Sequence, residues 1–301
     1  SLTYVFAENL TILMIIRFLH GIWFSILTTV TVPIVNDFIP AKRKGEGMGY
    51  FLMSINLGIV LGPLIGLTFI QSMPYTAVAG ILASFVVLGF IFCFLIPLPS
   101  HQKTAMETPK KRLSIHDFIE FKALPVALMA MMISFCYASI MSFIATFAES
   151  KHMLAYASLF FAVFAISMMS LRPITGKIYD RKGPNAVVYP ALILFSIGLA
   201  VLAFIDSVAG LLFSAVLIGM GFGSAQPCLQ TISIQRSPKN RIGHATSTYF
   251  TFYDLGIAIG SIVLGIIIAD TSYAVAYSIC AVLVLISLIY YKFMVASKPV
   301  S

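Results

Sequence analysis

Nine long apolar segments account for most of this 301-residue chain. Each approaches or exceeds the roughly 20 residues that a helix needs to cross the hydrocarbon core of a bilayer. They cover about residues 10–35, 47–70, 75–97, 123–147, 155–174, 186–205, 209–233, 244–268 and 272–292. Residues 1–8 are expected to be the tail of another helix. Since only helices and closed barrels satisfy their backbone groups in lipid, the pattern predicts an all-α, polytopic membrane helical bundle.

The composition excludes several other classes of protein. Hydrophobic residues make up 59% of the chain and charged residues 10%, whereas soluble domains carry about 25% charged residues. The four cysteines stand singly in apolar segments, without the spacing of a metal site. A membrane-embedded enzyme would need paired acids or clustered histidines near an interface, and the sequence has no DxxxD, HxxxH or HExxH pattern. We therefore expect no metal, no cofactor and no enzymatic activity.

The basic residues indicate how the chain lies in the membrane. The net charge is +8, but the Lys and Arg residues occupy short connections instead of a solvated domain, which argues against nucleic-acid binding. Seventeen of the 19 fall on one side of the predicted membrane, Lys151 falls on the other, and Arg17 lies within a segment. Such a bias predicts that the 17-residue side and the C-terminus are cytoplasmic. We expect a monomer in a bacterial plasma membrane.

The most polar connection predicts the domain organisation. Residues 98–122 read as a cytoplasmic linker between two bundles. Residues 1–97 are then a partial N-terminal transmembrane bundle, residues 123–294 a C-terminal six-helix bundle, and residues 295–301 a cytoplasmic tail.

An internal repeat supports two related bundles. A shift of 198 residues places residues 20–62 on residues 218–260 without a gap. The matching pairs are Gly21/Gly219, Phe24/Phe222, Ile34/Ile232, Pro40/Pro238, Arg43/Arg241, Gly45/Gly243, Leu57/Leu255, Gly58/Gly256 and Gly62/Gly260. The repeat unit is six helices, which is typical of transporters with two bundles and a site between them. About three helices, or roughly 90 residues, are expected to precede this chain in an intact protein of twelve spans.

Three motifs carry a resemblance to a known family. They are RFLHGIWFS (17–25), NLGIVLGPLIG (56–66) and GKIYDRKGP (176–184). They resemble the fourth-helix motif, the fifth-helix antiporter motif and the loop signature of the major facilitator superfamily, within its twelve-span drug–proton antiporter branch. The resemblance implies a major-facilitator fold with two pseudo-repeated six-helix halves, the first lacking about three helices here. It also implies a small-molecule substrate, protons and a lipid bilayer as partners.

Three polar residues within the apolar segments are candidates for proton coupling. A charge at mid-membrane costs about 2.5–3.5 kcal/mol, so Arg17 should face a cavity or a partner. His20 lies one turn further on the same face. Asp254 is the only acid deep in a segment, where burial favours the protonated form and a nearby cation opposes it. Each has a structural alternative: backbone hydrogen bonds for Arg17, a satisfied buried histidine for His20, and a helix-packing hydrogen bond to the facing bundle for Asp254.

Other candidates follow from the resemblance and the repeat. Candidate cavity residues are Phe24, Asn56, Tyr137, Gln226, Gln230 and Tyr253, with Asn56 matching Asp254 in the repeat. The antiporter motif contributes Gly58, Gly62, Pro63 and Gly66, as a hinge or seal or as plain close packing. Gly176, Asp180, Arg181 and Gly183 are expected in a short cytoplasmic loop, with Arg172 upstream, as a conformational latch or as a solvated turn.

These observations favour secondary active transport by alternating access. The first hypothesis is proton-coupled export of small amphipathic, drug-like molecules. The alternative is a proton-coupled symporter, or a narrow-specificity exporter, of a nutrient or metabolite.

Overall fold

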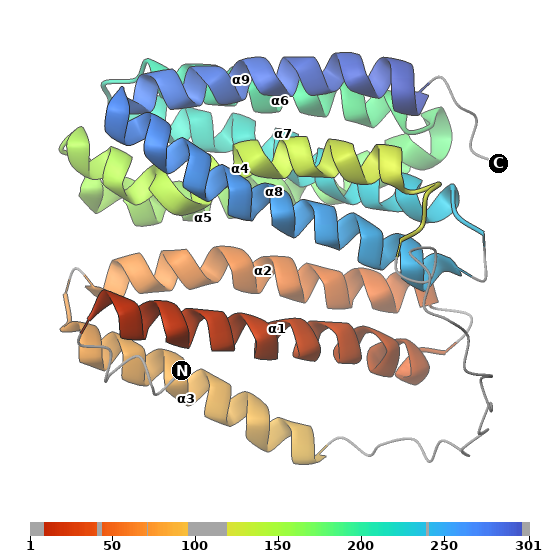
Figure 1. The fold of residues 1–301 in the computed structure, drawn as a ribbon, viewed down its shortest axis with the longest axis horizontal. Coiled ribbons are helices and arrows are strands. Elements are labelled where there is room, and N and C mark those ends of the chain that lie inside the picture. The colour runs from red at the N-terminus through yellow and green to blue at the C-terminus, as the bar shows by residue number, and fades with distance from the viewer. Residues whose placement is uncertain (1–8, 41–43, 71, 96–118, 239–240, 297–301) are drawn as a thin grey trace. The chain divides into compact units, whose positions relative to one another are not determined.

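The computed structural model describes residues 9–40, 44–70, 72–95, 119–238 and 241–296. Within these ranges the chain forms nine α-helices and no strand (Figure 1). They are α1 (Leu10–Phe38), α2 (Lys44–Ile70), α3 (Tyr75–Leu95), α4 (Leu124–Ser150), α5 (Ala157–Lys182), α6 (Asn185–Ala203), α7 (Val208–Gln235), α8 (Ile242–Asp270) and α9 (Tyr273–Tyr290). A 3₁₀ turn, η4 (Leu154–Tyr156), precedes α5, and a π-helical segment, η6 (Tyr291–Ala296), follows α9.

The helices are long and apolar enough for a membrane protein. Among the described residues, eight segments have the length and hydropathy to cross a bilayer, and α2 adds a shorter apolar stretch, Leu61–Ile70. The all-α bundle predicted from the apolar segments is therefore confirmed.

Side-chain hydrogen bonds at the N-terminus explain where three of the helices begin. The side-chain oxygens of Asn9, Ser207 and Ser272 accept hydrogen bonds from the backbone N–H groups three residues further on. Such caps satisfy amides that have no partner within the helix. The polar residue just before each apolar segment thus sets the start of α1, α7 and α9.

The chain divides into two compact units. Unit 1 (Ser1–Pro109) contains α1, α2 and α3, and unit 2 (Lys110–Ser301) contains α4 to α9. The predicted linker lies almost entirely outside the described residues, which resume at residue 119. Its cytoplasmic character and the predicted domain bounds stay predictions.

Unit 2 is held together by glycines that let α7 approach two helices closely. A Cβ atom added to Gly219 would meet Phe164 O of α5 at 2.6 Å, and one added to Gly223 would meet Met168 Cγ at 2.3 Å. On another face, a Cβ atom on Gly221 would meet Phe195 N of α6 at 2.4 Å. Small residues are the usual means of close helix packing in membranes, where burial of apolar surface gives no driving force between helices. The backbone of α7 therefore lies within contact distance of both α5 and α6.

A second close contact joins α8 to α4. A Cβ atom on Gly256 would meet Ser134 Oγ at 2.1 Å, and one on Gly260 would meet Phe135 O at 2.6 Å. Ser134 Oγ also donates to Tyr253 O at 2.7 Å. The two close contacts, around α7 and between α4 and α8, leave no space for larger side chains.

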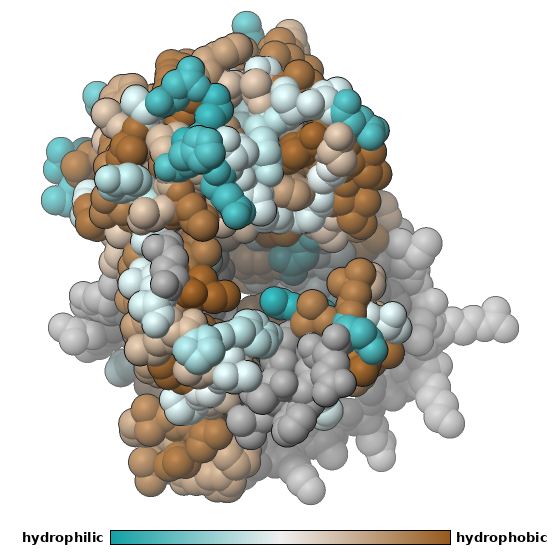
Figure 2. Space-filling model, turned by 90° about the vertical axis from the view of Figure 1, so that its left-hand side faces the viewer, coloured by the Kyte–Doolittle hydropathy of each residue, from teal (hydrophilic) through white to brown (hydrophobic). Residues whose placement is uncertain are grey.

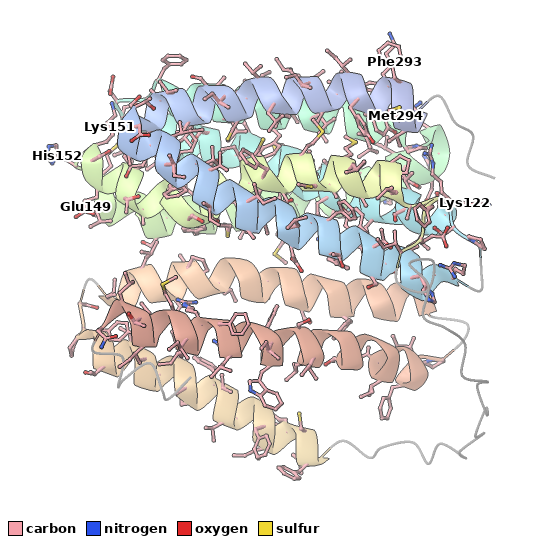
Figure 3. The ribbon with its side chains drawn as sticks, in the orientation of Figure 1. Lys122, Glu149, Lys151, His152, Phe293 and Met294 are labelled. Carbon is pink, nitrogen blue, oxygen red and sulfur yellow. The ribbon has the colours of Figure 1, made fainter. Side chains whose placement is uncertain are left out.

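The two ends of unit 2 differ in their side chains. Figure 3 shows Lys122 and Met294 at one end of unit 2, and Glu149, Lys151 and His152 at the other. Seen from the second end, unit 2 presents hydrophilic side chains with hydrophobic ones on its flanks (Figure 2). Lys151 there forms an ion pair with Asp206 of the connection between α6 and α7. Polar ends and apolar flanks are what a bundle that spans a bilayer requires.

Gly221→Ala is expected to destabilise unit 2 by about 1–3 kcal/mol. The added methyl group meets the backbone atoms Phe195 N and Ala191 O at 2.4 and 2.6 Å, which cannot rotate away. Thermal unfolding of the purified protein in detergent measures the effect.

Gly176→Ala is the matched control, because no atom lies within 4 Å of its Cβ position on α5. There the methyl group should stabilise the helix by up to about 1 kcal/mol. Equal thermal stability of Gly221→Ala and wild type would contradict the packing described for α7.

Candidate functional site

Tyr137 occupies the aromatic centre of unit 2. Its ring on α4 stacks on Phe222 of α7, with centroids 3.9 Å apart, and lies 6.1 Å from Phe164 of α5. The side chain is buried, at 4% exposure. These contacts join three helices through one ring, so Tyr137 has a packing role whether or not it also contacts substrate.

Two glutamines and two tyrosines lie on neighbouring helices of the same unit. Gln226 and Gln230 are half-buried on α7, and Tyr249 Oη of α8 donates to Gln226 O at 2.9 Å. The Tyr249 ring is 6.5 Å from that of Tyr253, which is half-buried. The structure thus brings the predicted cavity residues of α7 and α8 into one region.

Asp254 lies near the middle of α8 with its side chain exposed in the structure. It precedes Gly256 by two residues, which puts the two on opposite faces of the helix. Since Gly256 packs against α4, Asp254 faces away from that interface. Among the described residues its carboxylate accepts no hydrogen bond and forms no ion pair. Within unit 2 this side chain therefore takes no part in the packing of α8 against α4, and the hydrogen bond to the facing bundle stays a prediction.

The other candidates for coupling and for the cavity belong to unit 1. Arg17, His20 and Phe24 are exposed on α1, at successive turns of one face. Asn56 falls within α2, but its side chain lies outside the described residues. Arg17 and Asp254 are in different units, so each is described only within its own unit.

The antiporter-motif glycines differ from their repeat partners in packing. Helix α2 continues through Pro63, and Cβ atoms added to Gly58, Gly62 or Gly66 would meet nothing within 4 Å. In α8, by contrast, Gly256 and Gly260 are in tight contact with α4. The space beside these glycines is therefore occupied by a neighbouring helix in unit 2, whereas no atom lies within 4 Å of the Cβ positions in unit 1.

The expected location in a loop is wrong for three of the latch residues. Gly176, Asp180 and Arg181 lie in the last turns of α5, which runs to Lys182, and Arg172 also lies within this helix. The helix continues through Pro173 and Gly176 and ends at Gly183, whose φ of +80° favours glycine. Gly183 N–H donates to Tyr179 O at 2.9 Å and closes the helix. Only Gly183 and Pro184 then separate α5 from α6.

Arg172, like Asp254, is a membrane-segment charge of unit 2 without an ion-pair partner among the described residues. Its Nε atom is buried and donates to no acceptor, and the guanidinium forms no ion pair among the described residues. An unmade hydrogen bond of a buried donor costs about 1–3 kcal/mol, and more for a charged group. Such a group is a candidate for contact with something outside the described chain.

An ion pair that the sequence analysis missed joins the start of unit 2 to α8. Arg241 Nε donates to Glu120 Oε2, and Arg241 Nη2 donates to Ile119 O at 3.4 Å. Glu120 N–H also donates to Thr248 Oγ1 at 2.9 Å. The carboxylate is almost fully buried, with a side-chain exposure of 7%. Two features of the sequence could have drawn attention to this pair. Glu120 is an acid near the end of a basic linker, and Arg241 is the repeat partner of Arg43.

The surroundings of Glu120 change its pKa in opposing ways. Burial raises the pKa of this carboxyl group, but the hydrogen bond from Arg241, the backbone N–H of Lys122 and the charges of both residues outweigh it. The pKa of Glu120 therefore lies below its ordinary value of 4.5.

Further polar contacts connect the other helices at the same end of unit 2. Tyr179 Oη of α5 donates to Gln235 Oε1 of α7 at 2.7 Å, and Tyr291 Oη of η6 donates to Asn185 Oδ1 of α6 at 2.7 Å. Arg236, at the end of α7, donates to Val295 O. Across the described residues, no group of three or more His, Cys, Asp or Glu side chains is arranged to hold a metal ion.

An all-helical chain with this many membrane-crossing helices, two units and an internal repeat has the architecture of a polytopic membrane transporter. Comparison with known proteins agrees. The profile of the Major Facilitator Superfamily matches residues 1–261, and the chain belongs to that family.

Three relatives illustrate the range of similarity. The chain is 24% identical over 304 residues to the uncharacterised MFS-type transporter MJ1560 of Methanocaldococcus jannaschii, covering 94% of this chain and 74% of the relative. It is 24% identical to the uncharacterised MFS-type transporter YwoD of Bacillus subtilis, covering 82% of this chain and 55% of the relative. It is 23% identical to the multidrug resistance protein MdtG of Enterobacter lignolyticus, covering 94% and 69%. Two of these relatives are named as transporters, and the chain is a multi-pass membrane transporter of small molecules and not an enzyme.

Glu120→Gln is expected to lower the free energy of unfolding of unit 2 by about 2 kcal/mol at neutral pH, because Arg241 loses a charged acceptor. The folded-state pKa of Glu120 lies below 4.5. Its contribution is therefore complete above about pH 4.5 and is lost as the pH falls through the lower folded value. Thermal unfolding between about pH 6 and about pH 3.5 measures it.

Glu149→Gln is the control, because Glu149 is exposed at the opposite end of unit 2 (Figure 3). Wild type and Glu149→Gln should both lose more stability over this range than Glu120→Gln. Parallel pH profiles of Glu120→Gln and wild type would refute the assigned role of the ion pair.

Proposed function

We propose that this transporter exports small amphipathic molecules in exchange for protons, by alternating access. The observation that carries the proposal is Asp254, an acid within a membrane-spanning helix that faces away from the packed α4–α8 interface. An intramembrane carboxylate that is not used for packing within its bundle is free to take up and release a proton. Relatives named as multidrug resistance proteins support the export direction.

Arg17 and His20 complete the proposed coupling set. Both lie on one face of α1 within a membrane segment, where a cation favours the ionised form of a nearby carboxylate. In this scheme Asp254 is protonated from one side of the membrane and releases its proton on the other. The change in charge shifts the balance between the two orientations of the transporter.

The proposed substrate surface combines aromatic rings and amides. Gln226, Gln230 and Tyr253 are half-buried and supply donors, acceptors and an aromatic ring, whereas the rings of Tyr137, Phe222 and Tyr249 are buried in unit 2. Binding sites for amphipathic molecules are usually mainly apolar with a few polar groups that fix orientation. Phe24 and Asn56 are the proposed contributions of unit 1.

The remaining assignments are part of the same proposal. Gly58, Gly62, Pro63 and Gly66 would seal α2 against a neighbouring helix, since their exposed strip matches one that is packed in α8. Arg172, Gly176, Asp180, Arg181 and Gly183 would form the latch at the end of α5. The C-terminus is proposed to be cytoplasmic, and the protein to act as a monomer in a bacterial plasma membrane.

Asp254→Asn is expected to abolish substrate-triggered proton movement, because asparagine cannot titrate. The test uses the full-length protein in everted vesicles of a transporter-depleted bacterium, with a pH-sensitive dye and a panel of amphipathic dyes and antibiotics. The wild type should release protons when a substrate is added, and the mutant should lose at least about nine-tenths of that signal.

Asp270→Asn is the matched control, since Asp270 is an exposed acid at the end of the same helix. It should keep wild-type proton release. Release that survives in Asp254→Asn would overturn the role of this residue. Uptake of a nutrient together with protons, instead of release, would favour the symporter alternative.

A further inference from the structure

Helices α5 and α7 lie side by side in a constant register. Phe164 lies against Gly219, Met168 lies against Gly223, and Tyr179 donates to Gln235. Because the partners rise together along both helices, α5 and α7 are parallel. The contacts Met168–Gly223 and Tyr179–Gln235 mark the ends of a stretch of interface, which covers residues 168–179 on α5 and 223–235 on α7.

Three polar side chains fall within this bracketed stretch. Arg172 follows Met168 by four residues and precedes Tyr179 by seven, so it lies on the face of α5 that meets α7. Gln226 and Gln230 follow Gly223 by three and seven residues, on the face of α7 that meets α5. At the observed register, Arg172 is level with the stretch between the two glutamines.

The hydrogen-bonding capacity of these side chains is not used within the described chain. The buried Arg172 Nε has no acceptor, and no acid pairs with the guanidinium. The two glutamine side chains are half-buried and make no hydrogen bond among the described residues. A cluster of one cation and two amides, with donors to spare, is suited to an anion and disfavours a cation.

We propose that Arg172, Gln226 and Gln230 form an anion-binding site between α5 and α7, which takes the carboxylate or phosphate group of a small organic anion. The planar guanidinium matches either group with two parallel hydrogen bonds, and the amide N–H groups can supply more. Phe222 lies one turn before Gln226 on α7, and its buried ring stacks on Tyr137 of α4, so the surroundings of this stretch are apolar. The inference rests on the proposed function and names its substrate class as amphipathic anions.

The test measures binding of 2-naphthoate by the full-length protein in nanodiscs of phosphatidylcholine, with the neutral 2-naphthamide as the isosteric comparison. Arg172→Gln should raise the dissociation constant for 2-naphthoate by about tenfold or more and leave that for 2-naphthamide within about twofold. Lys177→Gln is the control, because it removes an exposed cation from the same helix. It should leave both dissociation constants within about twofold.

Two further variants keep the proposal testable if Arg172→Gln does not fold. Arg172→Lys keeps the charge but loses the planar donor fork, so its affinity for 2-naphthoate should be intermediate. Gln230→Leu should weaken 2-naphthoate binding and spare 2-naphthamide. Equal binding of 2-naphthoate by these variants and wild type, or no binding by wild type, overturns the proposal.

Repetition in nanodiscs that contain phosphatidylglycerol separates a soluble anion from a lipid headgroup. Binding of 2-naphthoate that persists supports the site as proposed. Arg172-dependent binding of the lipid, with none of 2-naphthoate in either disc, overturns it.

The proton-release assay distinguishes the two proposals. If proton-coupled export is observed but 2-naphthoate binding is unchanged in the Arg172 variants, the anion site is overturned and the proposed export function is kept. Arg172-dependent binding of 2-naphthoate without any proton movement removes the proposed proton-coupled export and keeps the anion site.

Discussion

The close approach of α7 to its neighbours is the constraint on which unit 2 depends. In a bilayer, helices gain little from burying apolar side chains against each other, so contact between backbones must supply the packing. Gly219 and Gly223 admit α5, and Gly221 admits α6 on another face. This fixes the register of α5 against α7, which in turn determines where Tyr137, Arg172 and the two glutamines lie.

Polar groups at one end of the unit add to this packing. Glu120, Arg241 and Thr248 connect the entry to α4 with the start of α8, and Tyr179 and Gln235 connect α5 with α7. Hydrogen bonds that involve charged groups are among the stronger ones, and at this end the groups need no full burial. Farther along the helices, the charged groups of Asp254 and Arg172 have no hydrogen-bond or ion-pair partner among the described residues.

The helices could be predicted from the sequence because the apolar segments have about the length of a membrane span, and α1, α7 and α9 each begin directly after a capping residue. The end of α5 could not, because the basic and acidic residues after Arg172 look like a loop by composition, while the helix ends only at Gly183. The ion pair of Glu120 and Arg241 joins residues 121 positions apart. Local patterns carry no information on such a contact. For the same reason the sequence suggested Tyr137 for the cavity but could not reveal its stacking between Phe164 and Phe222.

The connection between α5 and α6 consists of Gly183 and Pro184 alone. A link this short has no slack: proline fixes its own φ, and the glycine is held by its hydrogen bond to Tyr179 O. The two helices therefore form a stiff hairpin, in which a change in the tilt of α5 also changes the tilt of α6. A ligand that binds along α5 would therefore act on both α5 and α6.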